Sequence, residues 1–244
     1  MSQQKSGLVA LITGANKGIG FETARQLGKQ GITILVGSRN RQQGEEAASA
    51  LQAQEVKARA LVIDVTNQDT IDAAVEEVSR TFGKLDILVN NAGISVETVP
   101  PSQSQMENLR KTFDTNFFGA FAVTKAFLPL IQKAEEGRIV NVSSGLGSLT
   151  SLSDPDFEFY EYKILGYTAS KAALNALTVT LAKELRETAV KVNSADPGFT
   201  ATDLNNFRGK QTTGQAASVI VGLATLPPEG PTGEFFDKDG ALPW

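Results

Sequence analysis

LVALITGANKGIG, at residues 8–20, places an apolar strand, a glycine turn and the start of a helix in immediate succession. Gly14 permits the turn, while Gly18 and Gly20 let the backbone approach a pyrophosphate at the helix N-terminus. The spacing is GxxxGxG rather than GxGxxG, and glycines also mark ordinary turns, so the rest of the chain has to support this interpretation. The residues expected to contact a dinucleotide here are Gly14, Asn16, Lys17, Gly18, Ile19 and Gly20.

Apolar strands alternate with helical patterns along the whole chain. Strands are expected at 8–13, 32–37, 56–63, 86–90, 138–143, 190–195 and 233–237. Helices are expected at 18–30, 41–52, 68–82, 105–115, 117–133, 165–187 and 214–225. Such alternation is typical of parallel strands joined by right-handed crossovers. With no repeat or break in composition, we predict one α/β domain over residues 1–244: a Rossmann-type, doubly wound sheet of seven mainly parallel strands with helices on both faces.

The end of the second strand bears on the choice of dinucleotide. A site that prefers NAD carries an acid here to hold the ribose hydroxyls, whereas this strand ends in Gly37-Ser38-Arg39. Arg39, together with Lys17 of the glycine turn, suits the 2′-phosphate of NADP, which an arginine can grip through two hydrogen bonds. The alternative is a pair of solvated surface cations. We therefore expect NADP(H) as cofactor, with Ser38 and Arg39 at its phosphate.

The third and fourth strands also end in polar residues. Asp64-Val65 follows the third strand, and Asn90-Asn91-Ala92-Gly93 follows the fourth. Ligands of open α/β sheets bind at the carboxyl ends of strands. Asp64 has an alternative role as a cap of the next helix. The residues added to the expected cofactor site are Asp64, Val65, Asn91, Ala92 and Gly93.

Composition excludes several kinds of chemistry. The chain has neither cysteine nor histidine, so disulfides, thiolate catalysis and the commonest metal ligands are absent. Acid–base chemistry must then use tyrosine, lysine or carboxyl groups. The net charge is −4 with scattered basic residues, which argues against binding to nucleic acid or to an anionic membrane. The polar start, MSQQKSG, lacks a signal-peptide core, and no apolar run approaches the ~18 residues of a membrane span, so we expect a cytoplasmic protein.

Tyr167 and Lys171 carry the clearest chemical signal. They lie four residues apart in the expected helix 165–187 and so share one helical face. The preceding strand ends in Asn141-Val142-Ser143-Ser144, at the same rim of the sheet. An ammonium group beside a tyrosine favours the phenolate, so we expect the pKa of Tyr167 to be lowered from about 10 toward the working pH.

Taken together and in this order, these segments resemble the short-chain dehydrogenase/reductase family over nearly the full length of the chain. Within that family the glycine turn and the GSRN segment at 37–40 are similar to NADPH-dependent carbonyl reductases. The matching segments are TGANKGIG at 13–20, DV at 64–65, NNAG at 90–93, Asn116, VSS at 142–144, YTASK at 167–171, and Pro197-Gly198 followed by Thr200.

The resemblance implies roles for these residues. Tyr167 would donate a proton to the carbonyl oxygen, Lys171 would support Tyr167 and bind the nicotinamide ribose, and Ser144 would hydrogen-bond the substrate oxygen. Asn116 would hold a water that relays protons through Lys171. Ser143 is a rival for Ser144, and Asn116 is alternatively an ordinary residue at a helix break. The residues expected to flank the nicotinamide are Pro197, Gly198 and Thr200.

The implied activity is NADPH-dependent reduction of ketones or aldehydes, with a small-molecule carbonyl substrate. One alternative is a 3-oxoacyl thioester reductase of lipid synthesis, which would be expected to carry a basic patch for an acidic carrier protein. The other is an NADP-binding sensor without catalysis, which does not need the Ser–Tyr–Lys–Asn set. Fold alone does not decide the substrate.

Two segments and one helix lead to further expectations. The 151–164 insertion before Tyr167 carries four aromatic residues, and the polar 198–214 segment is expected to act as a substrate lid. The expected helix 117–133 is apolar nearly all round and needs cover on its outer side. We expect a homo-oligomer, dimer or tetramer, with the insertion near the substrate entrance. The alternative is a monomer in which the insertion covers the helix.

Overall fold

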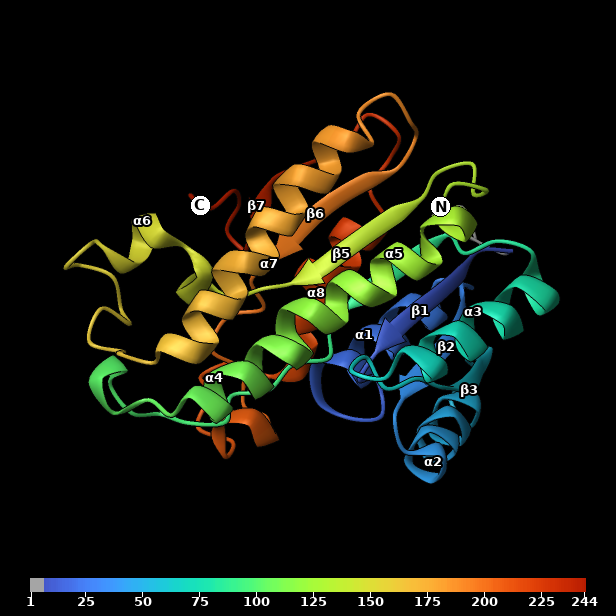
Figure 1. Ribbon diagram of the computed structural model, residues 1–244. Coiled ribbons are helices and arrows are strands. Elements are labelled where there is room, and N and C mark those ends of the chain that lie inside the picture. Colours follow the sequence, from blue (N-terminus) through green and yellow to red (C-terminus); the bar gives the residue numbers. More distant parts are fainter. Residues whose placement is uncertain (1–6) are drawn as a thin grey trace.

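The computed structural model describes residues 7–244 and contains one seven-stranded sheet in that part of the chain (Figure 1). The strand order is β3-β2-β1-β4-β5-β6-β7, and every neighbouring pair is parallel. The α/β prediction is confirmed. The strands are β1 (Val9–Thr13), β2 (Thr33–Ser38), β3 (Ala58–Val62), β4 (Ile87–Asn90), β5 (Arg138–Val142), β6 (Lys191–Ala195) and β7 (Phe235–Phe236).

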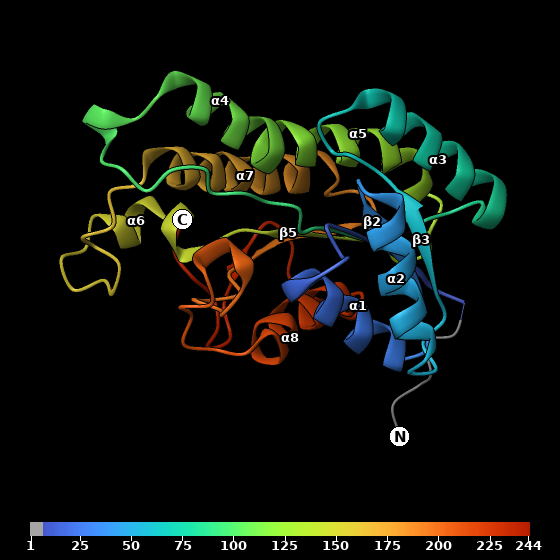
Figure 2. The same ribbon diagram turned by 90° about the horizontal axis from the view of Figure 1, so that it is seen from below.

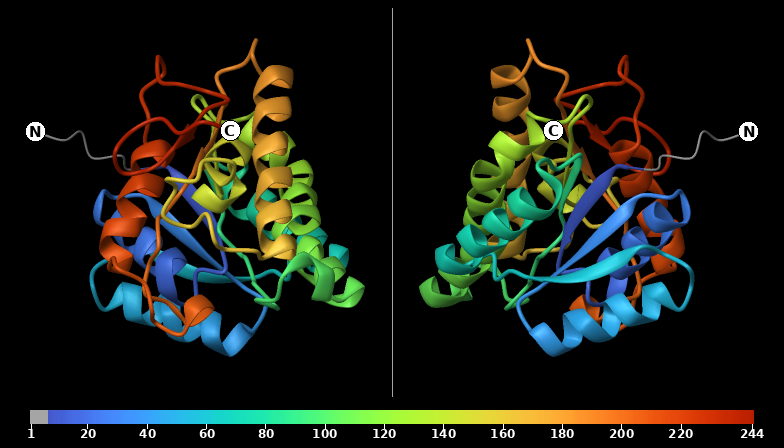
Figure 3. Two further views of the ribbon diagram at one scale, coloured as in Figure 1. Left: turned by 90° about the vertical axis from the view of Figure 1, so that its left-hand side faces the viewer. Right: turned by 90° about the vertical axis from the view of Figure 1, so that its right-hand side faces the viewer.

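Helices cover both faces of the sheet, as Figures 2 and 3 show. One face carries α1 (Gly18–Lys29), α2 (Arg41–Gln52) and α8 (Thr213–Ala224). The other carries α3 (Gln68–Phe82), α4 (Met106–Phe113), α5 (Ala120–Ile131) and α7 (Leu165–Glu184). Strand β1 alternates between the two cores: Ala10 and Ile12 pack into the first, Val9 and Leu11 into the second. Because a strand projects successive side chains to opposite faces, an uninterrupted apolar run is what a sheet covered on both sides requires.

The expected break between the helices at 105–115 and 117–133 is wrong. A π-helix at Asp114–Gly119 joins α4 to α5 without interruption. A π-turn accommodates an extra residue without ending the helix, and such turns are frequent at functional sites. A side chain on Gly119 would lie 2.7 Å from a methyl group of Val65, which explains the small residue at this close approach.

The sheet is shorter at its edges than the apolar pattern predicts. β3 begins at Ala58 instead of residue 56, because Val56 packs against Gly28 of α1 and lies outside the ladder. β7 is reduced to Phe235–Phe236, where the buried Phe235 stacks on Trp244. The short helix α6 (Leu149–Leu152) was not expected from the sequence.

The strand order reverses between β1 and β4, since β2 and β3 lie on one side of β1 and the later strands on the other. In open α/β sheets the crevice at this reversal is where ligands bind. The loops that follow β1, β4, β5 and β6 begin at this rim. Within residues 7–244 the structure contains no helix with both the length and the apolar character needed to cross a membrane. Residues 1–6, on which the expectation about a targeting segment partly rests, lie outside the described residues.

Candidate active site

The glycine turn forms an open cradle at the start of α1. Gly14 and Gly18 have φ values of 64° and 59°, a region that favours glycine. The N-cap residue Lys17 makes no side-chain cap, so the first N–H groups of α1 are left for another acceptor. The space at Gly18 is open, because a side-chain carbon there would meet only Thr202, at 3.8 Å. This geometry fits a phosphate group at a helix N-terminus.

Asn91 fixes the glycine turn to the end of β4. Its Nδ2 donates to the carbonyl oxygens of Thr13, at 2.8 Å, and Gly14, at 3.3 Å. A side chain on Gly20 would come within 2.4 Å of that nitrogen, so glycine is needed at this contact. The hydroxyl of Thr13 in turn accepts from the backbone N–H groups of Asn91 and Ala92, both at 3.0 Å. Two segments expected at the dinucleotide are thereby held together.

The two cations expected at a 2′-phosphate have different surroundings. Lys17 forms an ion pair with Asp203, with 3.0 Å between Nζ and Oδ2, whereas Arg39 is exposed and forms no ion pair with any residue in 7–244. Ser38 is buried, and its hydroxyl donates to the carbonyl oxygen of Asn40, which caps α2. The structure therefore leaves Arg39 more available to an added anion than Lys17.

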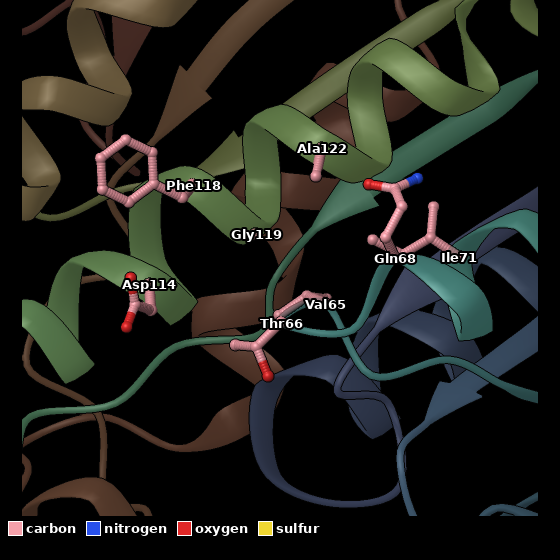
Figure 4. Close-up of a pocket in the computed structure, with 8 residues that line it drawn as sticks. All are labelled: Val65, Thr66, Gln68, Ile71, Asp114, Phe118, Gly119 and Ala122. Atoms are coloured by element: carbon pink, nitrogen blue, oxygen red, sulfur yellow. The ribbon is translucent and has the colours of Figure 1, made fainter.

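Asp64 and Val65 lie at the same rim. The carboxylate of Asp64 accepts from the backbone N–H and hydroxyl of Thr66, at 2.9 and 2.7 Å, whereas the cap of α3 is Asn67. Asp64 is therefore not the helix cap that the sequence left open as an alternative. Val65 borders a hollow of about 370 Å³ between α3 and the start of α5 (Figure 4). The residues around that hollow are Val65, Thr66, Gln68, Ile71, Asp114, Phe118, Gly119 and Ala122.

Asn116 connects the π-helix to the loop after β4. Its Oδ1 accepts from the N–H of Ile94 at 2.8 Å, and its Nδ2 donates to the carbonyl of Ile94 at 2.9 Å. The same Nδ2 also donates to the hydroxyl of Ser170, at 3.0 Å, which in turn donates to the carbonyl of Tyr167. Asn116 is therefore a buried connector within a continuous helix, and not a residue at a helix break.

Of the two adjacent serines after β5, Ser144 is the one that reaches Tyr167. The Ser144 hydroxyl faces the Tyr167 phenol and acts to lower its pKa, and it accepts from the N–H of Leu146, at 3.2 Å. Ser143 is buried, and its hydroxyl points to the carbonyl oxygen of Lys171, at 3.5 Å. The structure therefore favours Ser144 over its rival.

Tyr167 and Lys171 share one face of α7, as their spacing predicts. The ammonium of Lys171 lies 5.6 Å from the centre of the Tyr167 ring and donates to the carbonyl of Val142, at 2.7 Å. The expected lowering of the tyrosine pKa is wrong for this structure: burial, followed by the charge of Asp196, raises the pKa of Tyr167 to about 12. Burial also lowers the pKa of Lys171 to about 8. Desolvation disfavours the charged form of each group, and the phenol therefore keeps its proton at neutral pH.

The turn after β6 completes the rim. Gly198 has a φ of 69°, and the space where its side chain would lie is filled by the amide of Gln211, which donates to Pro197. The hydroxyl of Thr200 donates to the carbonyl oxygens of Pro197 and Gly198, both at 3.1 Å. The three residues that the resemblance places beside the nicotinamide thus form one compact turn.

Asp196 is a site residue that the sequence pattern did not indicate. It lies directly after β6, between Ala195 and the Pro197-Gly198 turn, and its carboxylate accepts from the N–H of Gly198 at 2.9 Å. Burial raises the pKa of this carboxyl, while the N–H groups of Gly198 and Gly145 that face it act in the opposite direction. Its position after β6 could have indicated this role, because the polar residues at the carboxyl ends of the other central strands all lie at the rim of the site.

The aromatic insertion contacts the expected lid. Phe159 packs edge-on against Phe199, with ring centres 5.6 Å apart, and also contacts Phe157 and Tyr162. Glu158 of the insertion pairs with Lys210 of the lid. We call Phe157, Phe159, Tyr162 and Phe199 the aromatic cluster. It lies beside Ser144, because a side-chain carbon added to the next residue, Gly145, would lie 3.5 Å from the ring of Phe157.

A Rossmann-type sheet with a phosphate cradle, and a Ser–Tyr–Lys set at the same rim, defines a nicotinamide-dependent oxidoreductase. The chain belongs to the short-chain dehydrogenase family, whose sequence profile matches residues 8–213.

Its relatives include enzymes with different carbonyl substrates. (−)-Isopiperitenone reductase of Mentha piperita is 34% identical, over 96% of this chain and 97% of its own. A 3-oxoacyl-[acyl-carrier-protein] reductase of Synechocystis is also 34% identical, over 96% of both chains. The NADPH-bound carbonyl reductase from chicken fatty liver superposes with a TM-score of 0.84 at 25% identity, over 98% of this chain and 99% of that one.

Proposed function

We propose that this enzyme reduces ketones or aldehydes to alcohols with NADPH, and that it acts on small, apolar carbonyl compounds in the cytoplasm. The observation that carries the proposal is the placement of the Ser144 hydroxyl beside the Tyr167 phenol, with Lys171 on the same helical face as Tyr167, at the rim that also holds the phosphate cradle. The likeness to an NADPH-bound carbonyl reductase supports it.

Each residue of the set has a distinct part in this chemistry. A bound NADPH supplies the hydride that reaches the carbonyl carbon. Tyr167 gives its phenolic proton to the carbonyl oxygen, and the Ser144 hydroxyl hydrogen-bonds the oxygen as negative charge develops on it. The ammonium of Lys171 stabilises the resulting phenolate, which takes a new proton from solvent before the next turnover. Asn116 holds the β4 loop in place, and we retain for it the role of positioning a proton-relaying water near Lys171.

The cradle and the rim residues supply a binding surface for the cofactor. We assign the pyrophosphate to the glycine turn, with Gly14, Asn16, Gly18, Ile19 and Gly20 around it. We assign the adenosine side of the cofactor to Ser38, Arg39, Asp64 and Val65. We assign the nicotinamide side to Asn91, Ala92, Gly93, Pro197, Gly198 and Thr200, together with Tyr167 and Lys171. Arg39 is exposed and lies where a site that prefers NAD carries an acid. This supports a preference for NADPH over NADH.

A substrate screen tests the proposed function. Purified protein is assayed with NADPH and with NADH against aryl and alkyl ketones, aldehydes, quinones and 3-oxoacyl thioesters. Turnover of ketones with NADPH supports the proposal. A thioester turned over far faster than any ketone would make it a lipid-synthesis enzyme, and tight NADPH binding without turnover of any carbonyl would make it a sensor.

The aromatic cluster is expected to favour apolar or aryl carbonyls, because ligand pockets bind through apolar surface with a few polar groups. Replacing Phe157 and Phe159 with Ser is expected to raise KM for aryl ketones several-fold and to leave the oligomer unchanged in sedimentation velocity. Replacement of the exposed Tyr160, which makes no ring contact within residues 7–244, is the matched control and is expected to leave KM unchanged. An unchanged KM in the double variant contradicts a role of the cluster in substrate binding.

We further propose that residues 198–214 form a lid that NADPH orders. The lid touches the cradle through Lys17–Asp203 and the insertion through Lys210–Glu158. Trypsin is expected to cut after Arg208 or Lys210 more slowly when NADPH is present. Cleavage after the exposed Arg186, in the turn after α7, is the internal control and is expected to be unaffected. Equal cleavage of the lid with and without NADPH contradicts the proposal.

The outer face of the continuous helix formed by the π-helix and α5 supports a homo-oligomer. Phe118 and Phe121 are 54% and 45% exposed, and the ring contacts of the insertion are with the lid and not with this helix. We therefore propose a dimer or tetramer that covers this face, and an insertion that contributes to the substrate entrance.

A further inference from the structure

Asp196 joins two segments that have to keep a fixed relation for the proposed chemistry. On one side its Oδ1 accepts from the N–H of Gly198, in the turn assigned to the nicotinamide. On the other side its carboxylate faces the N–H of Gly145, the residue after Ser144, and that N–H lowers the pKa of the carboxyl. The fit is close: a side-chain carbon on Gly145 would lie 2.9 Å from Oδ2 of Asp196.

The turn that follows Ser144 also packs against α7, the helix that carries Tyr167. Gly147, at the end of the 3-10 turn Gly145–Gly147, lies against Lys171, because a side-chain carbon there would come within 2.9 Å of the lysine backbone. Asn175 of α7 also donates to the carbonyl of Gly147, at 3.2 Å. Ser144 and the turn after it are therefore enclosed between Asp196 and α7.

Asp196 also has an electrostatic relation to the reacting pair. Its charge acts on both Tyr167 and Lys171, and in each case it favours the protonated form. The other groups that face the tyrosine are the ammonium of Lys171, on the same helix, and the neutral hydroxyl of Ser144. Asp196 itself faces Lys171 and the carboxylate of Asp237, which follows β7.

We propose that Asp196 is a positioning residue that holds the Ser144 turn against the nicotinamide-side turn and favours the protonated forms of Tyr167 and Lys171. Both effects prepare the site for carbonyl reduction. This inference rests on the proposed function, because reduction needs a phenol that still carries its proton. A neutral residue at position 196 would release the phenolate at lower pH and favour alcohol oxidation there.

Asp196→Asn removes the charge and keeps nearly the same shape. The alkaline limb of kcat/KM for NADPH-dependent ketone reduction is expected to move down by about one pH unit, since a neighbouring charge typically changes a pKa by about that amount. Alcohol oxidation with NADP is expected to appear at correspondingly lower pH. Asp237→Asn is the matched control: it removes the same charge from the next carboxylate outward and is expected to shift the limb much less.

A second measurement does not depend on turnover. Phenolate absorbance at 295 nm is recorded within milliseconds of an alkaline pH jump, before unfolding, and the trace of the matching Tyr167→Phe protein is subtracted, which isolates Tyr167 from the other two tyrosines. Its titration is expected to fall by about one pH unit in Asp196→Asn. If no carbonyl is reduced, the proposed function fails while this titration still tests Asp196.

The outcomes separate a clamp from a proton-loading residue. A slower enzyme with an unshifted pH profile and an unshifted Tyr167 titration makes Asp196 a structural clamp only and overturns the proposal. An equal shift in Asp237→Asn also overturns it, because the effect is then one of general charge. If Asp196→Asn does not fold, as judged by circular dichroism, the same two measurements are made on Asp196→Ser, which can still accept from Gly198.

Discussion

Replacing Tyr167 with Phe is expected to lower kcat by at least about 100-fold, because it removes the one phenolic proton that reaches the carbonyl oxygen and general acid catalysis contributes ~10²–10⁴-fold. The affinity for NADPH is expected to stay nearly unchanged, since the hydroxyl acts mainly in the transition state. The ring packing on α7 is retained, so a loss of rate is not a loss of fold. Steady-state kinetics and a fluorescence titration with NADPH measure the two quantities.

Tyr160→Phe is the matched control for this change. Tyr160 is exposed in the insertion, and the same loss of a hydroxyl there is expected to leave kcat unaltered. Lys171→Ala provides a contrast, because it removes a cation assigned both to the cofactor and to the phenolate and is expected to weaken NADPH binding as well as the rate. A Tyr167→Phe enzyme that keeps more than about a tenth of the original rate contradicts the role of general acid, given the ~100-fold minimum expected from its loss.

The features that the sequence predicts best are those set by short-range pattern. Residues 9–12 of the apolar run at 8–13 are buried on both sides of the sheet, and the glycines at 14 and 18 have the positive φ values that the turn requires. The pairing of Tyr167 with Lys171 follows from helical periodicity alone. In each case neighbouring residues determine the geometry, so the prediction needs no knowledge of distant contacts.

The predictions that were wrong or incomplete concern features that depend on contacts between distant segments. Asn116 looked like a helix break, but its amide reaches Ile94, and a π-turn accommodates the extra residue. The pKa of Tyr167 moves up instead of down because burial and the charge of Asp196, both products of the tertiary structure, raise it. Lys17 was paired with Arg39 as a phosphate ligand, yet the fold also brings Asp203 within 3.0 Å of it.

Arg39→Asp is expected to lower kcat/KM for NADPH by about ten- to hundred-fold, because a hydrogen bond to a charged group contributes ~1.5–3 kcal/mol. The new carboxylate would repel a 2′-phosphate and could accept from the ribose hydroxyls of NADH, so kcat/KM for NADH is expected to rise relative to that for NADPH. Lys17→Ala is expected to have a smaller effect, since Asp203 already neutralises part of that charge.

The charge change itself is controlled by Arg186→Asp, at an exposed position in the turn after α7. That variant is expected to leave both kcat/KM values unaltered, which separates a local contact at residue 39 from the effect of net charge on an anionic cofactor. The salt dependence adds a second criterion: the preference for NADPH is expected to weaken as ionic strength rises, because Arg39 is exposed and its interaction with phosphate is screened. Equal kcat/KM for NADPH and NADH in the unmutated protein would show that Arg39 does not select the cofactor.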